Sequence, residues 1–345
     1  MKRAAFGTLL AAGSASAVLS GAKPGLAQSQ SNATARLALG VSNYGRLPYF
    51  IAIDQGFFAR EHVDLAVTKF LGAASFQMAR MARGELDMMV TSLSPGIFNQ
   101  ILQGFDVKVI ASALGSHAGW NSTTWLVVRQ DVWESKAIRS PRELKGHTID
   151  GAVAGTPPDY LAKTLVTQAG LKDVVTVTEK FKSSPEWFAA LRNKAVDVQA
   201  LTEPTATELE IEGLAHKWIP IREVLPSYQE TYLVVNTPFL REHRDAVKGV
   251  VTAYLRAAKI VNGSDGKWTP SLAATAAAWT EIPLATVLRV PGPAYVGDFG
   301  SVDVTAVQKG LDFWVAQGLV SRTMPAGDII DTSVLRDARR EAGIR

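Results

Sequence analysis

The chain has 345 residues, of which 47% are hydrophobic and 20% charged. This length allows two domains of ordinary size, and the composition excludes disordered and collagen-like classes. The formal net charge is +4. Because Lys2, Arg3 and Lys23 lie in the first 27 residues, the rest of the chain carries only about +1 and gives no support to nucleic-acid binding.

The sequence contains no cysteine. Disulfides, thiol catalysis, zinc–thiolate sites and iron–sulfur clusters are therefore excluded. The fold must be stabilised by its apolar core alone.

The first 27 residues have the pattern of a secretory signal peptide. A basic start, Lys2-Arg3, precedes a run of small and apolar residues over 4–18, and Gly25-Leu26-Ala27 forms a small-x-small cleavage pattern before Gln28. The run is weakly apolar and shorter than the ~20 residues that a membrane span requires. We therefore predict cleavage after residue 27 and a flexible mature amino terminus over 28–35.

Regular structure is expected from Arg36, where Leu37, Leu39 and Val41 alternate with small residues as in a core strand. The pattern then alternates between helix and strand, which favours an α/β fold with a parallel sheet. We predict helices over 48–56, 75–84 and 95–104 and strands over 63–70, 86–90 and 107–114.

A second set of the same elements follows. Thr124–Arg129 and Thr231–Val235 are β-rich stretches that we interpret as strands crossing between two lobes. Between them we predict strands over 147–151, 174–178 and 196–201 and helices over 156–169, 185–192 and 204–212. The chain then returns with helices over 238–261, 272–279 and 304–317. The predicted domains are a first lobe over 36–124 and 236–345 and a second lobe over 125–235, with a hinge at the two crossings.

One pattern occurs in both lobes. Residues 83–95 and 192–204 each combine a helix end, an Asp, a short strand, a polar tip and a proline at the next helix start. Polar groups at the carboxyl ends of strands, beside helix amino termini, are where open α/β sheets bind ligands. Asp87 and Asp197 precede their strands, at the opposite end from the tips, so an acid/base pair is not expected.

The ordered set of these motifs resembles the nitrate/sulfonate/taurine group of ABC-importer solute-binding proteins, the SsuA-like or NMT1/THI5-like family. The resemblance covers residues 36–320, and the motifs that carry it are Pro48 with Gly56-Phe57-Phe58, Gly84-Glu85-Leu86-Asp87, Gly155-Thr156-Pro157, and Val196-Asp197 with Pro204.

The resemblance implies a type II periplasmic-binding-protein fold, with two α/β lobes joined by two crossover strands and a small ligand trapped between them. It also implies a periplasmic protein that delivers its ligand to an ABC permease with a cytoplasmic ATPase. We expect a monomer, because both lobe faces must be presented to the permease, and no cofactor.

Strand tips and helix amino termini at a cleft favour an anionic group, and sulfonate, taurine, nitrate or a carboxylate would fit. In the first lobe the candidate ligand-binding residues are Asn43, Tyr44, Ser75, Thr91, Ser92, Ser116, His117 and Trp120. In the second lobe they are Thr156, Asp159, Thr202 and Glu203.

Several of these candidates have a second interpretation. Ser75, Thr156 and Asp159 equally fit helix caps and first-turn acids. Glu203 would repel an anion, so it is expected to pair with a ligand amine, to receive a hydroxyl, to form a salt bridge with a neighbour such as Arg46, or to serve the scaffold. His117 has no second candidate ligand near it in the sequence, so no metal site is expected.

Three alternatives to uptake of an anion stay open. Aromatic residues near the tips favour a planar aromatic acid or a pyrimidine as ligand, and these residues are Tyr44, Tyr49, Trp120, Trp187 and Tyr228. A ligand sensor without a transport role would use the same scaffold. An enzyme is the third alternative, but the chain has no Gly-x-Ser-x-Gly, His-Glu-x-x-His, Gly-x4-Gly-Lys or Gly-x-Gly-x-x-Gly motif, so no catalytic residue is predicted.

Overall fold

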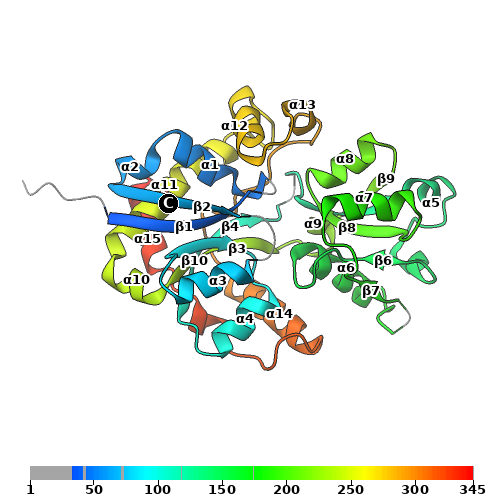
Figure 1. Ribbon diagram of the computed structural model, residues 1–345, viewed down its shortest axis with the longest axis horizontal. Helices are drawn as coiled ribbons and strands as arrows, with labels where there is room; N and C mark the ends of the chain where they lie inside the picture. Colours follow the sequence, from blue (N-terminus) through cyan, green and yellow to red (C-terminus); the bar gives the residue numbers. More distant parts are fainter. Residues whose placement is uncertain (1–32, 42–43, 71–73, 118, 174, 345) are drawn as a thin grey trace, which may run out of the picture. The chain divides into compact units, whose positions relative to one another are not determined.

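The computed structural model describes residues 33–344 apart from 42–43, 71–73, 118 and 174 (Figure 1). The predicted signal peptide and residues 28–32 lie outside the described residues. The chain from Asn32 onward forms one compact unit. None of the described helices has the length and apolar character needed to cross a membrane.

The first sheet has five strands in the order β2-β1-β3-β10-β4. β1 pairs in parallel with β2 and β3, whereas β10 runs antiparallel to β3 and β4. The strands are β1 (Ala33–Gly40), β2 (Val63–Phe70), β3 (Met88–Thr91), β4 (Val107–Gly115) and β10 (Gln229–Asn236). β1 starts three residues before the expected Arg36, because Ala33 already pairs with Val63.

Helices cover both faces of this sheet, and each face has its own core. Leu37, Val90 and Leu233 pack on one face against α1 (Leu47–Asp54), α2 (Phe57–Arg60), α11 (Arg244–Asn262), α12 (Pro270–Thr280) and α15 (Ser333–Glu341). On the other face, Met89 and Val234 pack against α3 (Ser75–Ala82), α4 (Pro95–Leu102) and α14 (Val304–Ala316).

The second sheet also has five strands, in the order β7-β6-β8-β5-β9. β6 pairs in parallel with β7 and β8, and β5 runs antiparallel to β8 and β9. The strands are β5 (Thr124–Arg129), β6 (Ile149–Asp150), β7 (Val177–Thr178), β8 (Val198–Thr202) and β9 (Ala215–Pro220).

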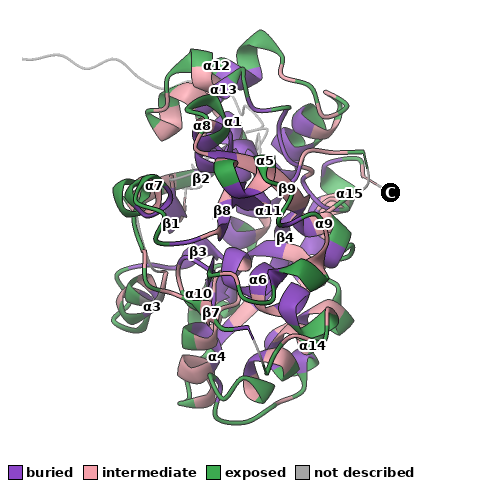
Figure 2. Cartoon of the chain, turned by 90° about the vertical axis from the view of Figure 1, so that its right-hand side faces the viewer, coloured by how far each residue is buried: buried purple, intermediate pink, exposed green. Residues whose placement is uncertain are grey.

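Helices cover both faces of the second sheet as well. α5 (Gln130–Glu134), α6 (Pro157–Gln168), α9 (Ile221–Val224) and the 3-10 turn η2 (Pro141–Leu144) share one core with Leu126 and Val198. α7 (Ser184–Arg192) and α8 (Thr205–Ile211) share the other with Val127 and Leu201. Figure 2 shows buried residues along the strands and exposed ones on the outer surfaces of α3 and α7.

β10 differs from the expected lobe boundary. Residues 229–235 fall within the range predicted for the second lobe, yet β10 pairs in the first sheet. Its apolar residues explain this position, because Leu233 and Val235 belong to one core of that sheet and Val234 to the other. The two sheets are therefore linked by residues 116–123 and 221–228.

Four further elements complete the described chain, namely η1 (Tyr44–Arg46), α10 (Thr237–Glu242), α13 (Leu284–Val287) and η3 (Ala326–Ile329). The single helix expected over 238–261 is interrupted at His243, whose φ of −128° lies outside the helical range, so α10 and α11 are separate.

Candidate functional site

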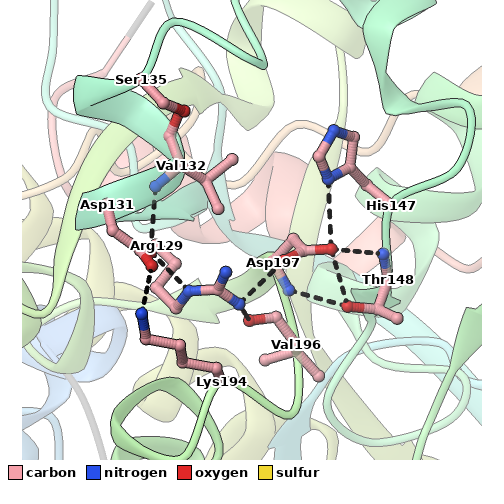
Figure 3. A network of polar contacts seen from close by, with 9 residues as sticks. All are labelled: Arg129, Asp131, Val132, Ser135, His147, Thr148, Lys194, Val196 and Asp197. Atoms are coloured by element: carbon pink, nitrogen blue, oxygen red, sulfur yellow. Dashed lines mark hydrogen bonds and ion pairs between the residues drawn. The ribbon is translucent and has the colours of Figure 1, made fainter.

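The aspartates of the repeated pattern tie neighbouring strands together. Asp87 accepts hydrogen bonds from the backbone N–H of Arg36 (2.8 Å) and from its guanidinium Nε (2.9 Å). Asp197 accepts the backbone N–H of Thr148 (2.9 Å) and forms an ion pair with Arg129 (2.8 Å; Figure 3). Both carboxylates therefore fasten strand starts, at the opposite end of each strand from its polar tip.

Ion pairing also sets the protonation of this network. Burial alone would raise the pKa of Asp197, but hydrogen bonds from Thr148 and His147 and the charge of Arg129 lower it below its ordinary value. The Lys194 ammonium and the Arg129 guanidinium lower the pKa of Asp131 to about 2 (Figure 3). These groups stay ionised at neutral pH.

The strand-tip loops of the two lobes meet at Gly155. A Cβ added there would lie 2.4 Å from Cδ of Pro95, the first residue of α4, so the backbone at Gly155 lies against the ring of Pro95. Gly155 has a φ of +75°, a conformation that glycine adopts readily. The amino-terminal ends of α4 and α6 therefore lie together between the lobes. That the Thr91 and Thr202 tips of the repeated pattern share a cleft stays a prediction.

The tip residues themselves lie in different surroundings. Thr91 is buried, and its hydroxyl donates to the carbonyl of Ser92 (3.1 Å). Thr202 is half-buried and pairs with Thr124 across β8 and β5. Ser92 is half-buried beside Pro95. Their contact with ligand stays a prediction.

Tyr44 carries a buried hydroxyl with no hydrogen-bond partner among the described residues. Its ring lies edge-on to that of Trp268, with centroids 5.5 Å apart. Burial raises the pKa of Tyr44, and so do the nearby carboxylates of Glu203 and Glu208. The charge of the second-lobe Glu203 thus acts on the first-lobe Tyr44.

The remaining first-lobe candidates are Asn43, Ser75, Ser116, His117 and Trp120. Asn43 lies outside the described residues, and Ser75 is the first residue of α3 rather than its cap, a position taken by Ala74. The Oγ of Ser116 is buried without a partner among the described side chains and backbone groups. His117 and Trp120 pack on Tyr295, with ring centroids 4.5 and 5.3 Å apart.

In the second lobe, side chains of the protein itself make the polar contacts at the amino terminus of α6. Asp159 is fully buried, accepts the N–H of Gly155 (2.8 Å) and pairs with Lys163 (2.9 Å). The Thr156 hydroxyl donates to the Val153 carbonyl (2.6 Å), and the first two helical residues are prolines without an N–H. Both predicted residues thus have structural roles, and their contact with ligand stays a prediction.

Glu203 likewise uses both carboxylate oxygens within the protein. One oxygen pairs with Lys217 (3.2 Å) and the other accepts the N–H of Thr207 in α8 (3.1 Å). Burial raises the pKa of Glu203, and the Lys217 ammonium opposes this shift. The salt-bridge partner is thus Lys217 and not the expected Arg46. Burial lowers the pKa of Arg46 to about 10, opposed by the charge of Glu230.

Glu230 was not singled out in the sequence. It is buried and accepts hydrogen bonds from the hydroxyls of Thr123 (2.5 Å) and Thr124 (2.9 Å). Burial raises its pKa, and those hydrogen bonds oppose the shift. Glu230 lies at the start of β10, and the two threonines lie at the start of β5. The carboxylate therefore connects the two places where the chain passes between the sheets. A lone Glu within a β-rich stretch carries no signal of this role.

A pocket that sequence reasoning missed lies between α6 of the second lobe and β10, α4 and α14 of the first. Of the residues singled out in the sequence, Tyr228 alone lines it. Its walls are Leu93, Phe98, Tyr160, Tyr228, Gln229, Tyr232, Ala306, Val307, Gly310 and Trp314. In the part of the chain that the structure describes, no three His, Asp or Glu residues are grouped so that they could hold a metal ion.

A family model described as NMT1/THI5 like matches residues 43–263. The chain belongs to the NMT1/THI5-like family. This confirms the resemblance seen in the sequence. No curated protein matches the chain.

Solved structures place this NMT1/THI5-like chain in a known fold. The alkanesulfonate-binding protein SsuA from Xanthomonas axonopodis pv. citri, bound to MOPS, is 16% identical, with a TM-score of 0.68 over 87% of this chain and 98% of that one. SsuA from Escherichia coli is 17% identical, with a TM-score of 0.69 over 86% and 97%. The nitrate-binding protein NrtA from Synechocystis PCC 6803 is 13% identical, with a TM-score of 0.71 over 89% and 88%. The chain therefore has the predicted periplasmic-binding-protein fold.

Proposed function

We propose that this NMT1/THI5-like protein is the solute-binding component of an ABC importer and captures a small anionic solute between its lobes by hinge closure. The observation that carries the proposal is the direct contact between strand-tip loops of the two lobes, Gly155 against Pro95, on sheets joined by two links. This arrangement encloses a ligand when the links bend. The structural likeness to sulfonate- and nitrate-binding proteins supports the same role.

The charge distribution favours an anion held mainly by the first lobe. Arg46 lies there and is half-buried, and α4 presents its amino terminus after Ser94. In the second lobe the amino termini of α6 and α8 already hold the carboxylates of Asp159 and Glu203. We infer that a sulfonate, taurine, nitrate or carboxylate ligand directs its negative group toward the first lobe.

The other parts of the proposal follow from the sequence and the family. The amino-terminal signal pattern supports export to the periplasm and cleavage after residue 27. The partners are a permease and its cytoplasmic ATPase, and the working form is a monomer. Binding alone is assigned to the chain, without turnover of the ligand.

Thermal-shift screening of the mature chain tests this function. The panel is taurine, ethanesulfonate, MOPS, nitrate, aromatic carboxylates and pyrimidines. A ligand at 100 times its Kd stabilises the folded state by about 2.7 kcal/mol, which raises the melting temperature measurably. Failure of every compound to stabilise the protein would contradict the proposal, and chemical conversion of a bound compound would contradict the purely binding role.

A planar aromatic acid or a pyrimidine is the second candidate ligand. The pocket beside Tyr160 favours it, because three tyrosines, Phe98 and Trp314 make up five of its ten lining residues. The same screen separates the two candidates, since only one class of compound is expected to stabilise the protein.

A further inference from the structure

The pocket between α6 and the first sheet is rich in hydrogen-bond donors. Its polar side chains are those of Tyr160, Tyr228, Tyr232, Gln229 and Trp314, and no charged side chain lines it. The Gln229 amide is already engaged, because it donates to the carbonyl of Ser301 (2.6 Å) and accepts the N–H of Asp303 (2.9 Å). Three phenol hydroxyls and one indole N–H remain.

No hydrogen bond joins these four polar groups to the described residues, and none of the four is among the fully buried polar atoms without a partner. Their polar tips therefore keep some exposure, although Tyr160, Tyr232 and Trp314 as whole residues are only 7%, 3% and 3% exposed. Tyrosine and tryptophan tips in such positions ordinarily find a hydrogen-bond partner, and these donors are open to a group that enters the pocket.

The four side chains come from separate elements and meet at one place. The ring of Tyr160 lies 5.1 Å from that of Tyr228 and 5.4 Å from that of Trp314. Tyr160 belongs to α6 of the second lobe, whereas Tyr232 lies in β10, Trp314 in α14 and Tyr228 in the link that leads to β10. Movement of one lobe against the other therefore opens or closes the pocket.

We propose that this pocket is a subsite for an oxygen atom of the ligand's anionic group, held by the hydroxyls of Tyr160, Tyr228 and Tyr232 and the indole N–H of Trp314. This subsite rests on the proposed solute-binding function. Neutral donors to a charged oxygen form strong hydrogen bonds without a competing counter-ion in the pocket. The pocket is partly open, and its volume of about 20 Å³ has room for one water-sized group, which is the size of a single leading oxygen.

The surrounding electrostatics agree with donor hydroxyls. Burial raises the pKa of Tyr228 and of Tyr232, so both phenols stay protonated at neutral pH. The carboxylates of Glu230 and Asp303 add to these shifts but do not line the pocket. Lys163 lies 6.0 Å from the Trp314 ring, but its ammonium is already paired with Asp159 and Glu179.

Tyr160→Phe and Tyr232→Phe test the subsite in the mature full-length chain, because each removes only a hydroxyl and keeps the ring packing. We expect calorimetric titration with ethanesulfonate, MOPS and nitrate to give about tenfold to a hundredfold weaker binding for each variant. Tyr254→Phe is the control. Its hydroxyl donates to the Ser112 carbonyl (3.0 Å) away from the pocket, so that variant is expected to bind like the wild type.

A second readout does not depend on the tyrosine variants. The indole N–H resonance of Trp314, assigned with Trp314→Phe, is expected to move when the anion binds to the wild-type protein. An anion that binds with unchanged affinity to both tyrosine variants and leaves this resonance in place overturns the subsite and spares the proposed function. Stabilisation by pyrimidines alone also overturns the subsite, and a panel without any binder overturns both proposals.

Discussion

At the scale of single residues, the polar groups between the lobes divide into those that the protein satisfies itself and those that it leaves open. Asp159, Glu203 and Glu230 each accept two or more contacts from the chain. The Tyr44 hydroxyl is buried without a partner among the described residues, and no hydrogen bond joins the Tyr232 hydroxyl to them. We expect the second group to govern ligand affinity and the first to govern stability.

Glu203→Gln separates these two roles. The substitution removes the charge that pairs with Lys217 and weakens the cap on α8, so we expect the free energy of unfolding to fall by about 1–3 kcal/mol while anion affinity stays unchanged. Urea unfolding and calorimetric titration measure the two quantities. Glu242→Gln, an exposed site, is the control. Weaker binding of an amine-bearing ligand at unchanged stability would instead assign Glu203 to the ligand.

The raised pKa of Glu230 predicts a pH dependence of stability. The folded state holds a proton on this carboxyl at pH values where the unfolded chain, with a value near 4.5, has lost it. Its contribution to stability is therefore present below pH 4.5 and is lost as the pH rises through the folded pKa. In Glu230→Gln the decline should be smaller than in the wild type. Urea unfolding between about pH 4.5 and 7 measures it, and parallel profiles for the two proteins would contradict the prediction.

At the scale of elements, the strands and the aspartates that fasten them were the most predictable features. The ranges 63–70 and 124–129 match β2 and β5 as predicted, because both stretches are rich in β-branched and apolar residues. β9 was not predicted, because His216 and Lys217 interrupt its apolar pattern. The amphipathic α15 was not predicted either, because its arginines obscure the apolar positions.

The Asp197 network supports a prediction at this scale. Asp197→Asn keeps the side-chain shape but loses the ion pair to Arg129, so the start of β8 is held less firmly. We expect unfolding to become easier by about 1–3 kcal/mol and ligand affinity to stay the same. Thermal unfolding and calorimetry check this, with the exposed Asp173→Asn as the matched substitution. Loss of binding in a stable variant would show that Asp197 acts on the site.

The candidate site was harder to predict than the elements. Local patterns placed Tyr44 and Glu203 at strand ends, and in the structure the charge of Glu203 acts on the Tyr44 hydroxyl. The Tyr160 pocket depends on which helix of one lobe packs against which helix of the other. No spacing within α6 or α14 encodes that contact, so only the three-dimensional arrangement of the lobes exposes it.

At the scale of the whole molecule, the contact between Gly155 and Pro95 leads us to expect that closure of the two lobes contributes to anion affinity. Gly155→Ala places a methyl group against Pro95, so we expect the closed form to be disfavoured and anion affinity to fall by at least about tenfold. Gly170→Ala is the control, because Gly170 has a similar φ of +73° but open space around it. Calorimetry compares the two, and small-angle scattering reports the lobe separation. Equal affinities would show that this contact does not limit closure.

Tyr160 has a consequence for the rate of capture. This second-lobe side chain is packed into a core of the first lobe, against Tyr228, Phe313 and Trp314. Any movement that separates the lobes must first separate these rings. Spontaneous separation of the aromatic rings would then limit the rate at which solute binds. The observed association rate would level off at high solute concentration instead of rising in proportion to it.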